Sequence, residues 1–401
     1  MTREASSALD YSQRIVAVDV LRGICLLGIL FINAPLMNSP YWMNAKMFAF
    51  QSTEFDRFID SFFHIFVDSC FYPIFCFMFG ISTSLFLWSR NKSHPERFYL
   101  RRILSLFLFG LLQVLLVWWG DILMIYACVG IFLIPMRKMT QQQIKMFIYF
   151  VGVFVLLSRL AYVYYGGANY GTFQDFRLVY QNGNFIEIFQ QRLKDGFLGL
   201  LATFTNPKHI GNWFSDISYY SGVLFLFLYG YYVQTFGILK SLLSNVGKIK
   251  QYAFLCLFII LVSRSLAYIF PFYKEFYSYV ATLSQSQFYA MLVFFLVVRT
   301  QNRFWFRGFA LMGRMSLSNY LLCNTLMSLV LYNYGLGLYG KIGPGTIFFI
   351  VPCIYLIAYF FTRYWLKFYD YGPMEYLWRY LTYGQKAKQM SAPIEVSRKE
   401  I

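Results

Sequence analysis

Apolar stretches of membrane-spanning length recur along the whole chain, and they restrict it to a polytopic membrane fold. A helix of about 20 apolar residues crosses the hydrocarbon core of a bilayer, where only helices and closed barrels satisfy every backbone polar group. The chain is 58% hydrophobic and 13% charged, which is unusual for a soluble domain. We therefore predict an all-α bundle of about ten transmembrane helices. The spans are placed at residues 15–37, 61–88, 98–118, 121–136, 144–165, 215–237, 251–270, 284–299, 309–333 and 345–366.

The positions of the basic residues predict that both termini lie in the cytoplasm. If the N-terminus is inside, the inside segments hold 23 of the 35 lysines and arginines, and the outside segments hold 8. This bias follows the positive-inside rule. The net charge of +17 then reflects topology and attraction to anionic membrane lipid. No basic module with interleaved aromatic residues is present, so nucleic acid is not an expected partner.

This topology divides the chain into five parts. They are a cytoplasmic segment at 1–14, helices 1–5 at 15–165, an extracytoplasmic loop at 166–213, helices 6–10 at 214–384 and a disordered cytoplasmic tail at 385–401. The first span is expected to remain as an anchor, because charged residues interrupt its apolar run and no small-residue cleavage site follows. Within the loop, residues 185–204 have the pattern of an amphipathic helix on the outer surface. This helix is either a lid over a substrate or a strut at the membrane interface.

The first span carries three polar residues at membrane depth. Asp19 and Arg22 are three residues apart, which allows them to pair on one helix face. Arg22 and Asn33 are separated by about three turns and therefore share a face. Because charge within the membrane is costly, this face should point into the protein. Either these side chains form part of a site, or Arg22 reaches the inner interface, Asp19 neutralises it and Asn33 joins two helices.

A stripe of acidic and titratable residues marks the second span. Asp56, Asp60, His64 and Asp68 recur every four residues and lie along one helical face. A neighbouring carboxylate orients an imidazole and raises its pKa, which suits a general base. His64 is therefore a candidate base with Asp60 or Asp68 as its partner; the alternative is a hydrated, outward-facing helix end. A metal site is not expected, because no second histidine lies near His64 in the sequence.

Three further charged residues fall at the outer ends of other spans. Arg159 and Arg264 each lie in the outer third of a span, where two arginines can bind a carboxylate or phosphate group. Alternatively, they neutralise Asp68 and Asp121 within the bundle. Asp121 follows a tight turn and is a helix cap, an acid at a site, or both. The seven cysteines fall in or beside apolar spans without a CxxC pair, so we expect small buried hydrophobic residues rather than disulfides or metal ligands.

Three separated regions of the chain resemble one family. They read VDVLRGICLLGILFIN near the start, WWGDILMIYACVGI in the middle, and GRMSLSNYLL, YGLGLYGKIGP and YGPMEYLWRYLTYG toward the end. Together they resemble the bacterial YeiB-like family, catalogued as domain of unknown function 418, across almost the whole chain. The resemblance implies a multi-pass protein of the bacterial cytoplasmic membrane. Members of this family have been loosely described as transport-related.

The first helix is also similar to that of the wider transmembrane acyltransferases. Those enzymes move an acyl group from a cytoplasmic donor, commonly acyl-CoA, to a sugar or envelope acceptor. In the acyltransferase-3 group, an Arg-Gly pair is followed by a histidine eleven residues after the arginine. Arg22 matches that arginine, whereas Asn33 occupies the histidine position, and asparagine is no general base. The heparan-glucosaminide acetyltransferase group also has asparagine there and a histidine further on; here the next histidine is His64.

Two functions follow as hypotheses, and a non-catalytic envelope accessory is a third. In the first, the protein is an acyltransferase with acyl-CoA as a candidate co-substrate, an envelope glycan or lipid as acceptor, and no tightly bound cofactor or metal. In the second, it transports a small anionic solute or lipid precursor, although no internal repeat is evident. The catalytic candidates are His64, Asn33, Asp68 and Asp121, and the substrate-binding candidates are Arg22, Asp19, Arg159 and Arg264.

Overall fold

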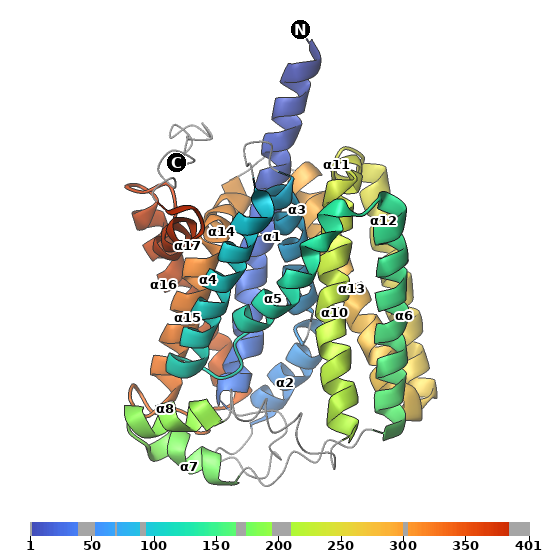
Figure 1. Cartoon of the computed structure of the whole chain (residues 1–401). Coiled ribbons are helices and arrows are strands. Elements are labelled where there is room, and N and C mark those ends of the chain that lie inside the picture. The colour runs from blue at the N-terminus through green and yellow to red at the C-terminus, as the bar shows by residue number, and fades with distance from the viewer. Residues whose placement is uncertain are drawn as a thin grey trace.

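The computed structural model of the chain is a bundle of α-helices with short 3-10 turns, and the residues that it describes form no strand (Figure 1). These are residues 2–38, 53–68, 70–88, 94–165, 174–194, 210–299 and 304–384. Seven helices in this part of the chain are long and apolar enough to cross a membrane. The predicted all-α polytopic bundle is therefore confirmed. The tail predicted at 385–401 lies outside the described residues.

Each predicted span coincides with a helix or a pair of helices. The long helices are α1 (Thr2–Asn38), α3 (Phe71–Leu87), α4 (Pro95–Leu116), α6 (Gln141–Tyr165), α10 (Ile210–Thr235), α12 (Val246–Ile269), α13 (Lys274–Arg299) and α16 (Pro344–Trp365). The shorter helices are α2 (Glu54–Phe66), α5 (Leu123–Gly130), α7 (Gln174–Asn182), α8 (Phe185–Leu193), α11 (Ile238–Leu243), α14 (Phe304–Arg314), α15 (Ser316–Leu331) and α17 (Pro373–Tyr383). The 3-10 turns are Ile131–Leu133, Pro135–Lys138 and Pro271–Tyr273.

Three predicted spans are interrupted in the structure. Residues 61–88 break between α2 and α3, and residues 309–333 break at Met315 between α14 and α15. The span at 121–136 holds only the eight residues of α5, followed by 3-10 turns. Pro135 has no N–H to bond the carbonyl of Ile131, which explains why the regular helix does not continue there. Broken helices at membrane depth leave backbone groups that other parts of the protein must satisfy.

The first helix, α1, runs through the middle of the bundle and contacts α3, α14, α15 and α16 (Figure 1). Two glycines bring it close to α14. A Cβ atom on Gly23 would lie 2.0 Å from the carbonyl oxygen of Phe309, and one on Gly313 would lie 1.9 Å from that of Asp19. Small residues permit this kind of close approach between membrane helices. The segments VDVLRGICLLGILFIN and GRMSLSNYLL, which carry part of the family resemblance, are therefore in direct backbone contact.

The two ends of the bundle differ in what they hold. The start of α1, α11 and α17 lie at one end, and α7 and α8 lie at the other (Figure 1). We call these the inner end and the outer end, following the predicted orientation. The helices nearest the two termini lie at the same end, in agreement with the predicted topology. Which of the two ends faces the cytoplasm stays a prediction.

The outer end is closed by α7, α8 and the turn-rich segment 332–343. Arg192 on α8 is fully buried and donates to the carbonyl of Leu116 at 2.5 Å and to the hydroxyl of Tyr334 at 2.7 Å. Asn38, the last residue of α1, donates to the carbonyl of Ile342 at 3.0 Å. These contacts fix α8 on the bundle and favour the strut over the lid for the helix predicted at 185–204. The second half of that prediction, residues 195–204, lies outside the described residues.

Candidate functional site

Polar residues from three distant segments meet inside the bundle. Asn33 on α1 donates from Nδ2 to Oδ1 of Asn324 on α15, at 3.2 Å. One turn earlier on α15, the hydroxyl of Tyr320 donates to Oδ1 of Asp121, at 2.7 Å. None of the four residues is more than 7% exposed. We call Asn33, Asp121, Tyr320 and Asn324 the polar core; each of the three regions that carry the family resemblance contributes to it.

Asp121 has two roles in the polar core. Its Oδ2 accepts from the backbone N–H of Leu123 at 2.8 Å, at the start of α5, while its Oδ1 accepts from Tyr320. The capping contact that the sequence allowed is therefore present on a buried carboxyl group, and a role for Asp121 as an acid at a site stays a prediction. Tyr320 and Asn324 are one turn apart on α15 and share a face. This face of α15 thus presents a hydroxyl group toward α5 and an amide group toward α1.

Three buried side-chain hydrogen-bond donors, one in the polar core and two on the segment that precedes Asp121, have no partner within the described chain. They are Nδ2 of Asn324, Nε2 of Gln113 and Nε1 of Trp118. Gln113 and Trp118 stand at the end of α4 and shortly after it, and so precede Asp121 by a few residues. Leaving a buried donor unsatisfied costs about 1–3 kcal/mol. Each of these donors is free to bind an oxygen atom of a ligand that reaches it.

A second polar group lies closer to the inner end of α1. Arg22 pairs with Asp19 at 3.1 Å and donates to Oγ of Ser82 on α3 at 2.5 Å. The predicted Asp19–Arg22 pair is present, and it faces the interior of the bundle. The two side chains stay partly accessible, at 26% for Arg22 and 14% for Asp19. This cation is therefore held in place but remains within reach of a ligand.

The stripe on α2 does not join the polar core. The side chain of His64 is 73% exposed, and its Nδ1 lies 3.4 Å from Oδ2 of Asp68. The residue that α2 turns toward α1 is Phe63, whose ring centroid lies 5.6 Å from that of Phe31. The residue that follows His64 in the chain, Ile65, is an exposed apolar side chain. His64 therefore lies on an exposed helix face, which was the alternative interpretation of the sequence, whereas Asp56 at the start of the stripe is 8% exposed and accepts from the backbone N–H of Gly345 at 2.9 Å.

The two outer arginines lie in different surroundings. Arg264 donates to the carbonyl of Ile65 at 3.2 Å and to Oε1 of Gln285 at 2.9 Å, so it supports the end of α2. Arg159 lies over the ring of Tyr279, 4.5 Å from its centroid. Its Nε is buried without a hydrogen-bond partner in the described chain. Substrate binding by these two arginines stays a prediction, and the geometry gives Arg264 a structural contact.

Sequence reasoning missed Tyr320 as a site residue and left Asn324 without a role. Tyr320 is one of 34 tyrosines, and nothing in its local pattern sets it apart. Asn324 carried a usable signal, because a carboxamide inside an apolar span usually joins helices. Its partner, 291 residues away, was not predictable from spacing. The polar core therefore becomes visible only once the helices are packed.

One residue of the C-terminal motif has a clear structural role. Oε1 of Glu375 accepts from the backbone N–H groups of Leu317 at 2.7 Å and Ser318 at 3.1 Å, at the start of α15. A carboxylate at a helix N-terminus satisfies free N–H groups and complements the helix dipole. The motif segments GRMSLSNY and YGPMEY thus contact each other through a helix cap. This cap fixes the start of the helix that carries Tyr320 and Asn324.

The described residues contain no group of three His, Cys, Asp or Glu side chains that could hold a metal ion. All seven cysteines are free thiols. Cys25, Cys70, Cys76 and Cys323 are buried as expected, but Cys128 and Cys353 are exposed on the bundle surface. The expectation of buried cysteines was wrong for these two. In a membrane bundle an apolar residue is equally suited to the core and to a surface that faces lipid.

Comparison with known proteins supports the family resemblance. A model of the family described as "Protein of unknown function (DUF418)" matches residues 235–385. The "Uncharacterized protein YxaH" of Bacillus subtilis (strain 168) is 28% identical over 395 residues, covering 93% of this chain and 95% of that protein. The "Uncharacterized protein YeiB" of Escherichia coli (strain K12) is 24% identical over 396 residues, covering 92% and 96%. These matches confirm the predicted resemblance to a YeiB-like DUF418 family.

Proposed function

We propose that this YeiB-like membrane protein transfers an acyl group from a cytoplasmic donor, such as acyl-CoA, to an envelope glycan or lipid on the outer side of the bacterial cytoplasmic membrane. The main support is the spacing of polar groups along α1. Arg22 and Asn33 are eleven residues apart, which is about 16 Å along a helix and about half of the hydrocarbon core. A donor with its phosphates at Arg22 and its acyl group on an arm of that length would reach the polar core.

The proposed reaction uses the polar core as follows. The oxygen of an acceptor hydroxyl attacks the carbonyl carbon of the acyl thioester, while Asp121, held by Tyr320, takes the hydroxyl proton. Amide N–H groups of Asn33 and Asn324 donate to the oxyanion of the tetrahedral intermediate. As the intermediate collapses, the C–S bond breaks and the leaving thiolate takes the proton from Asp121. An ester and a free thiol leave, and the protein returns to its starting state.

This proposal assigns the proton acceptor to Asp121 instead of His64. A general base must lie within hydrogen-bond reach of the proton that it takes. His64 is highly exposed on α2, whereas Asp121 is 3% exposed and bonded to Tyr320. A buried carboxyl group that is bonded to a tyrosine one helical turn from Asn324 is suited to a site where charge develops during a reaction.

The test is the composition of the envelope in a deletion strain. The strain would be complemented with the wild-type protein, with Asp121→Asn, or with Asp60→Asn, which changes an exposed carboxyl on α2 in the same way. Mass spectrometry of the glycan, polymer and lipid fractions should reveal an acyl-sized mass that the wild type and Asp60→Asn restore and Asp121→Asn does not. No mass difference between the wild-type and deletion strains would overturn acyl transfer. Restoration by Asp121→Asn would overturn the assigned base.

Transport of a small anionic solute or lipid precursor is a second candidate. Its support is the combination of a buried acid, Asp121, with a very short α5 and a break at Met315, because transport sites often use interrupted helices and intramembrane carboxyl groups. Uptake into proteoliposomes under a proton gradient would favour this function, provided that Asp121→Asn abolishes it. Uptake that is equal with and without the gradient would contradict proton-coupled transport, since Asp121 would then have no role in coupling uptake to proton flow.

A further inference from the structure

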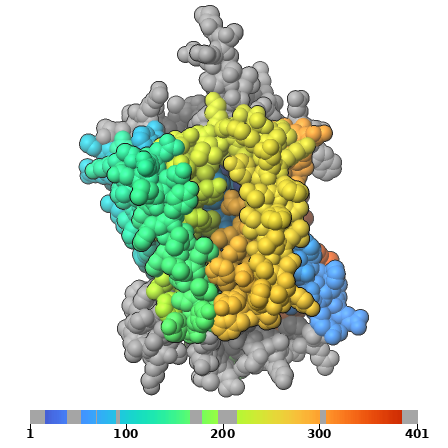
Figure 2. All heavy atoms as spheres, turned by 90° about the vertical axis from the view of Figure 1, so that its right-hand side faces the viewer, coloured from blue at the N-terminus to red at the C-terminus, as the bar shows by residue number. Residues whose placement is uncertain are grey.

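We propose that the inner end of the bundle holds a specific site for an anionic phospholipid between α11 and α12. A cavity of about 340 Å³ opens there, and Figure 2 shows the face to which it belongs as hollowed between α6 and α12. This volume is within the usual range for small-ligand sites. The site is separate from the polar core, and the proposal does not depend on acyl transfer.

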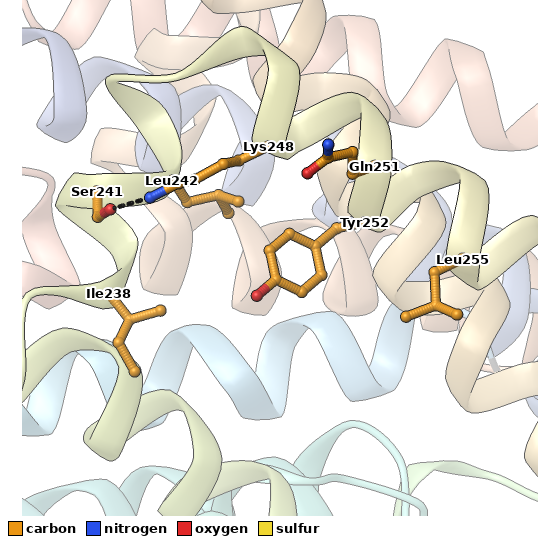
Figure 3. Close-up of a pocket in the computed structure, with 7 residues that line it drawn as sticks. All are labelled: Ile238, Ser241, Leu242, Lys248, Gln251, Tyr252 and Leu255. Atoms are coloured by element: carbon orange, nitrogen blue, oxygen red, sulfur yellow. Dashed lines mark hydrogen bonds between the residues drawn. The ribbon is translucent and has the colours of Figure 1, made fainter.

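The cavity wall is amphiphilic. Figure 3 shows Lys248, Gln251 and Tyr252 from α12 and Ile238 from α11 around one space. The remaining lining residues are Ser241, Leu242 and Leu255, so no acidic side chain lines the cavity. A charged head with polar groups and an attached hydrocarbon chain would match both parts of this wall.

Lys248 is positioned to bind a phosphate group. Its Nζ donates to Oγ of Ser241 at 2.9 Å, which holds the flexible side chain at the cavity. An ammonium group has three donors, so two are left for phosphate oxygens. Lys240 and Lys250 add positive charge nearby in sequence, and no acidic residue occurs between Asp216 and Glu275. An anion that enters the cavity therefore meets a cation already fixed in place, which lowers the entropic cost of binding.

The surroundings of the cavity indicate that its ligand comes from the bilayer. Only 11% of the most apolar window of α12 is buried in the bundle. Below the cavity, α12 exposes Phe254 at 73%, Phe258 at 58% and Leu261 at 60%, as a lipid-facing helix would. The predicted orientation places Lys248 at the level of the inner leaflet, where anionic headgroups are available. The acyl chain of a bound lipid would run from Leu255 along this apolar face.

The test uses native mass spectrometry of the purified full-length protein in a zwitterionic detergent. The protein would be incubated with equal amounts of phosphatidylglycerol and phosphatidylcholine. We expect phosphatidylglycerol adducts to dominate in the wild type and to fall about tenfold in Lys248→Met, the effect of losing one charge-assisted hydrogen bond. Lys145→Met, which removes a lysine from the start of α6, should leave them unchanged. Lys248→Arg should retain most of the binding, because it keeps the charge.

Additional controls separate loss of the site from loss of folding. Gel filtration would confirm that each variant is monodisperse, and Leu255→Trp, which fills the apolar side of the cavity without changing its charge, should also reduce adducts. Equal binding of the two lipids by the wild type, or unchanged adducts in Lys248→Met, would overturn the site. Displacement of phosphatidylglycerol by an equal concentration of inorganic phosphate would overturn its assignment to lipid, because recognition would then require the phosphate alone.

Discussion

The polar core and the stripe on α2 use similar residue types in opposite surroundings. The stripe places Asp60, His64 and Asp68 at regular helical spacing, yet the His64 side chain is 73% exposed. The polar core draws one residue from α1, two from α15 and one from just before α5, and Asp121 in it is 3% exposed. An exposed ion pair contributes little, whereas inside a bundle each polar group needs a partner. Regular spacing of polar residues therefore predicted a shared helix face but not its burial, and a catalytic role for His64 stays a prediction.

The comparison also separates two kinds of polar residue within the bundle. Glu375 and Arg264 satisfy backbone groups at helix ends, so their partners are part of the fold. Asn324 keeps a buried donor without a protein partner in the described chain. Such a donor is costly unless a ligand uses it. We therefore expect substitutions in the polar core to affect activity more than folding, and substitutions at the helix ends to do the reverse.

The largest expected effect contrasts Asn33→Ala with His64→Ala. If Asn33 donates to the oxyanion, its loss should slow acyl transfer by about 10²–10³, while His64→Ala should change the rate less than twofold. The measurement is the rate of acyl incorporation into the acceptor by the purified, reconstituted protein. Asn324→Ala serves as a second member of the polar core. If the rate of acyl transfer fell strongly with His64→Ala but not with Asn33→Ala, the site would lie on α2 and His64 would be the base.

The next effect concerns stability and contrasts a buried arginine with an exposed one. Arg192→Met leaves the carbonyl of Leu116 and the hydroxyl of Tyr334 without a donor, and we expect it to lower the free energy of unfolding by about 2–4 kcal/mol. Arg57→Met removes a side chain that is 69% exposed and whose ion pair with Glu54 is long, at 4.0 Å. Its effect on the free energy of unfolding should therefore be below about 0.5 kcal/mol. Unfolding in mixed micelles would measure both. Equal losses would show that α8 is not fixed by Arg192.

A smaller effect at Glu375 depends on pH. Burial raises the pKa of this carboxyl group above its usual value. The folded protein then binds its proton more tightly than the unfolded chain, so this contribution to stability is greatest at low pH and is lost as the pH rises toward the folded-state pKa. Glu375→Gln should remove that pH dependence, and Glu375→Ala should cost about 1 kcal/mol as a lost cap. Melting temperatures at several pH values would test this; an unchanged slope in Glu375→Gln would contradict it.

Much of the fold followed from the sequence, and less of the candidate site did. Apolar length and the bias of basic residues indicated the all-α bundle, because a helix must be long and apolar to cross a bilayer. The same rule could not show which helix face points inward, since lipid and protein core are equally apolar. The stripe around His64 was therefore as consistent with a site as with a surface. Asn33 was identified because polar residues at membrane depth are costly, and Asp121 because it follows a tight turn and can cap a helix, but their partners on α15 required the packed helices.

The smallest expected effect tests whether the polar core acts as one unit. Asn33 and Asn324 share a hydrogen bond of 3.2 Å, and a double-mutant cycle with Asn33→Ala and Asn324→Ala should give a coupling energy of about 0.6 kcal/mol, the average for such bonds between membrane helices. The matched cycle with His64→Ala and Asp68→Ala should give about 0–0.3 kcal/mol, because the exposed pair is screened by solvent.

The size of the Asn33–Asn324 coupling also tests whether the two amides act in the reaction or only in the fold. If the Asn33–Asn324 coupling is larger when measured on the activation free energy of transfer than on unfolding, the two amides act together on the reacting group. Equal coupling in both measurements would mean that the bond only joins α1 to α15, as carboxamides often do between membrane helices. In that case the two amides would not stabilise the oxyanion, and Asp121 and Tyr320 would act without them. Other hydrogen-bond donors would then be needed at the oxyanion. Gln113 and Trp118 have buried donors without a partner in the described chain and lie nearest to Asp121 in sequence.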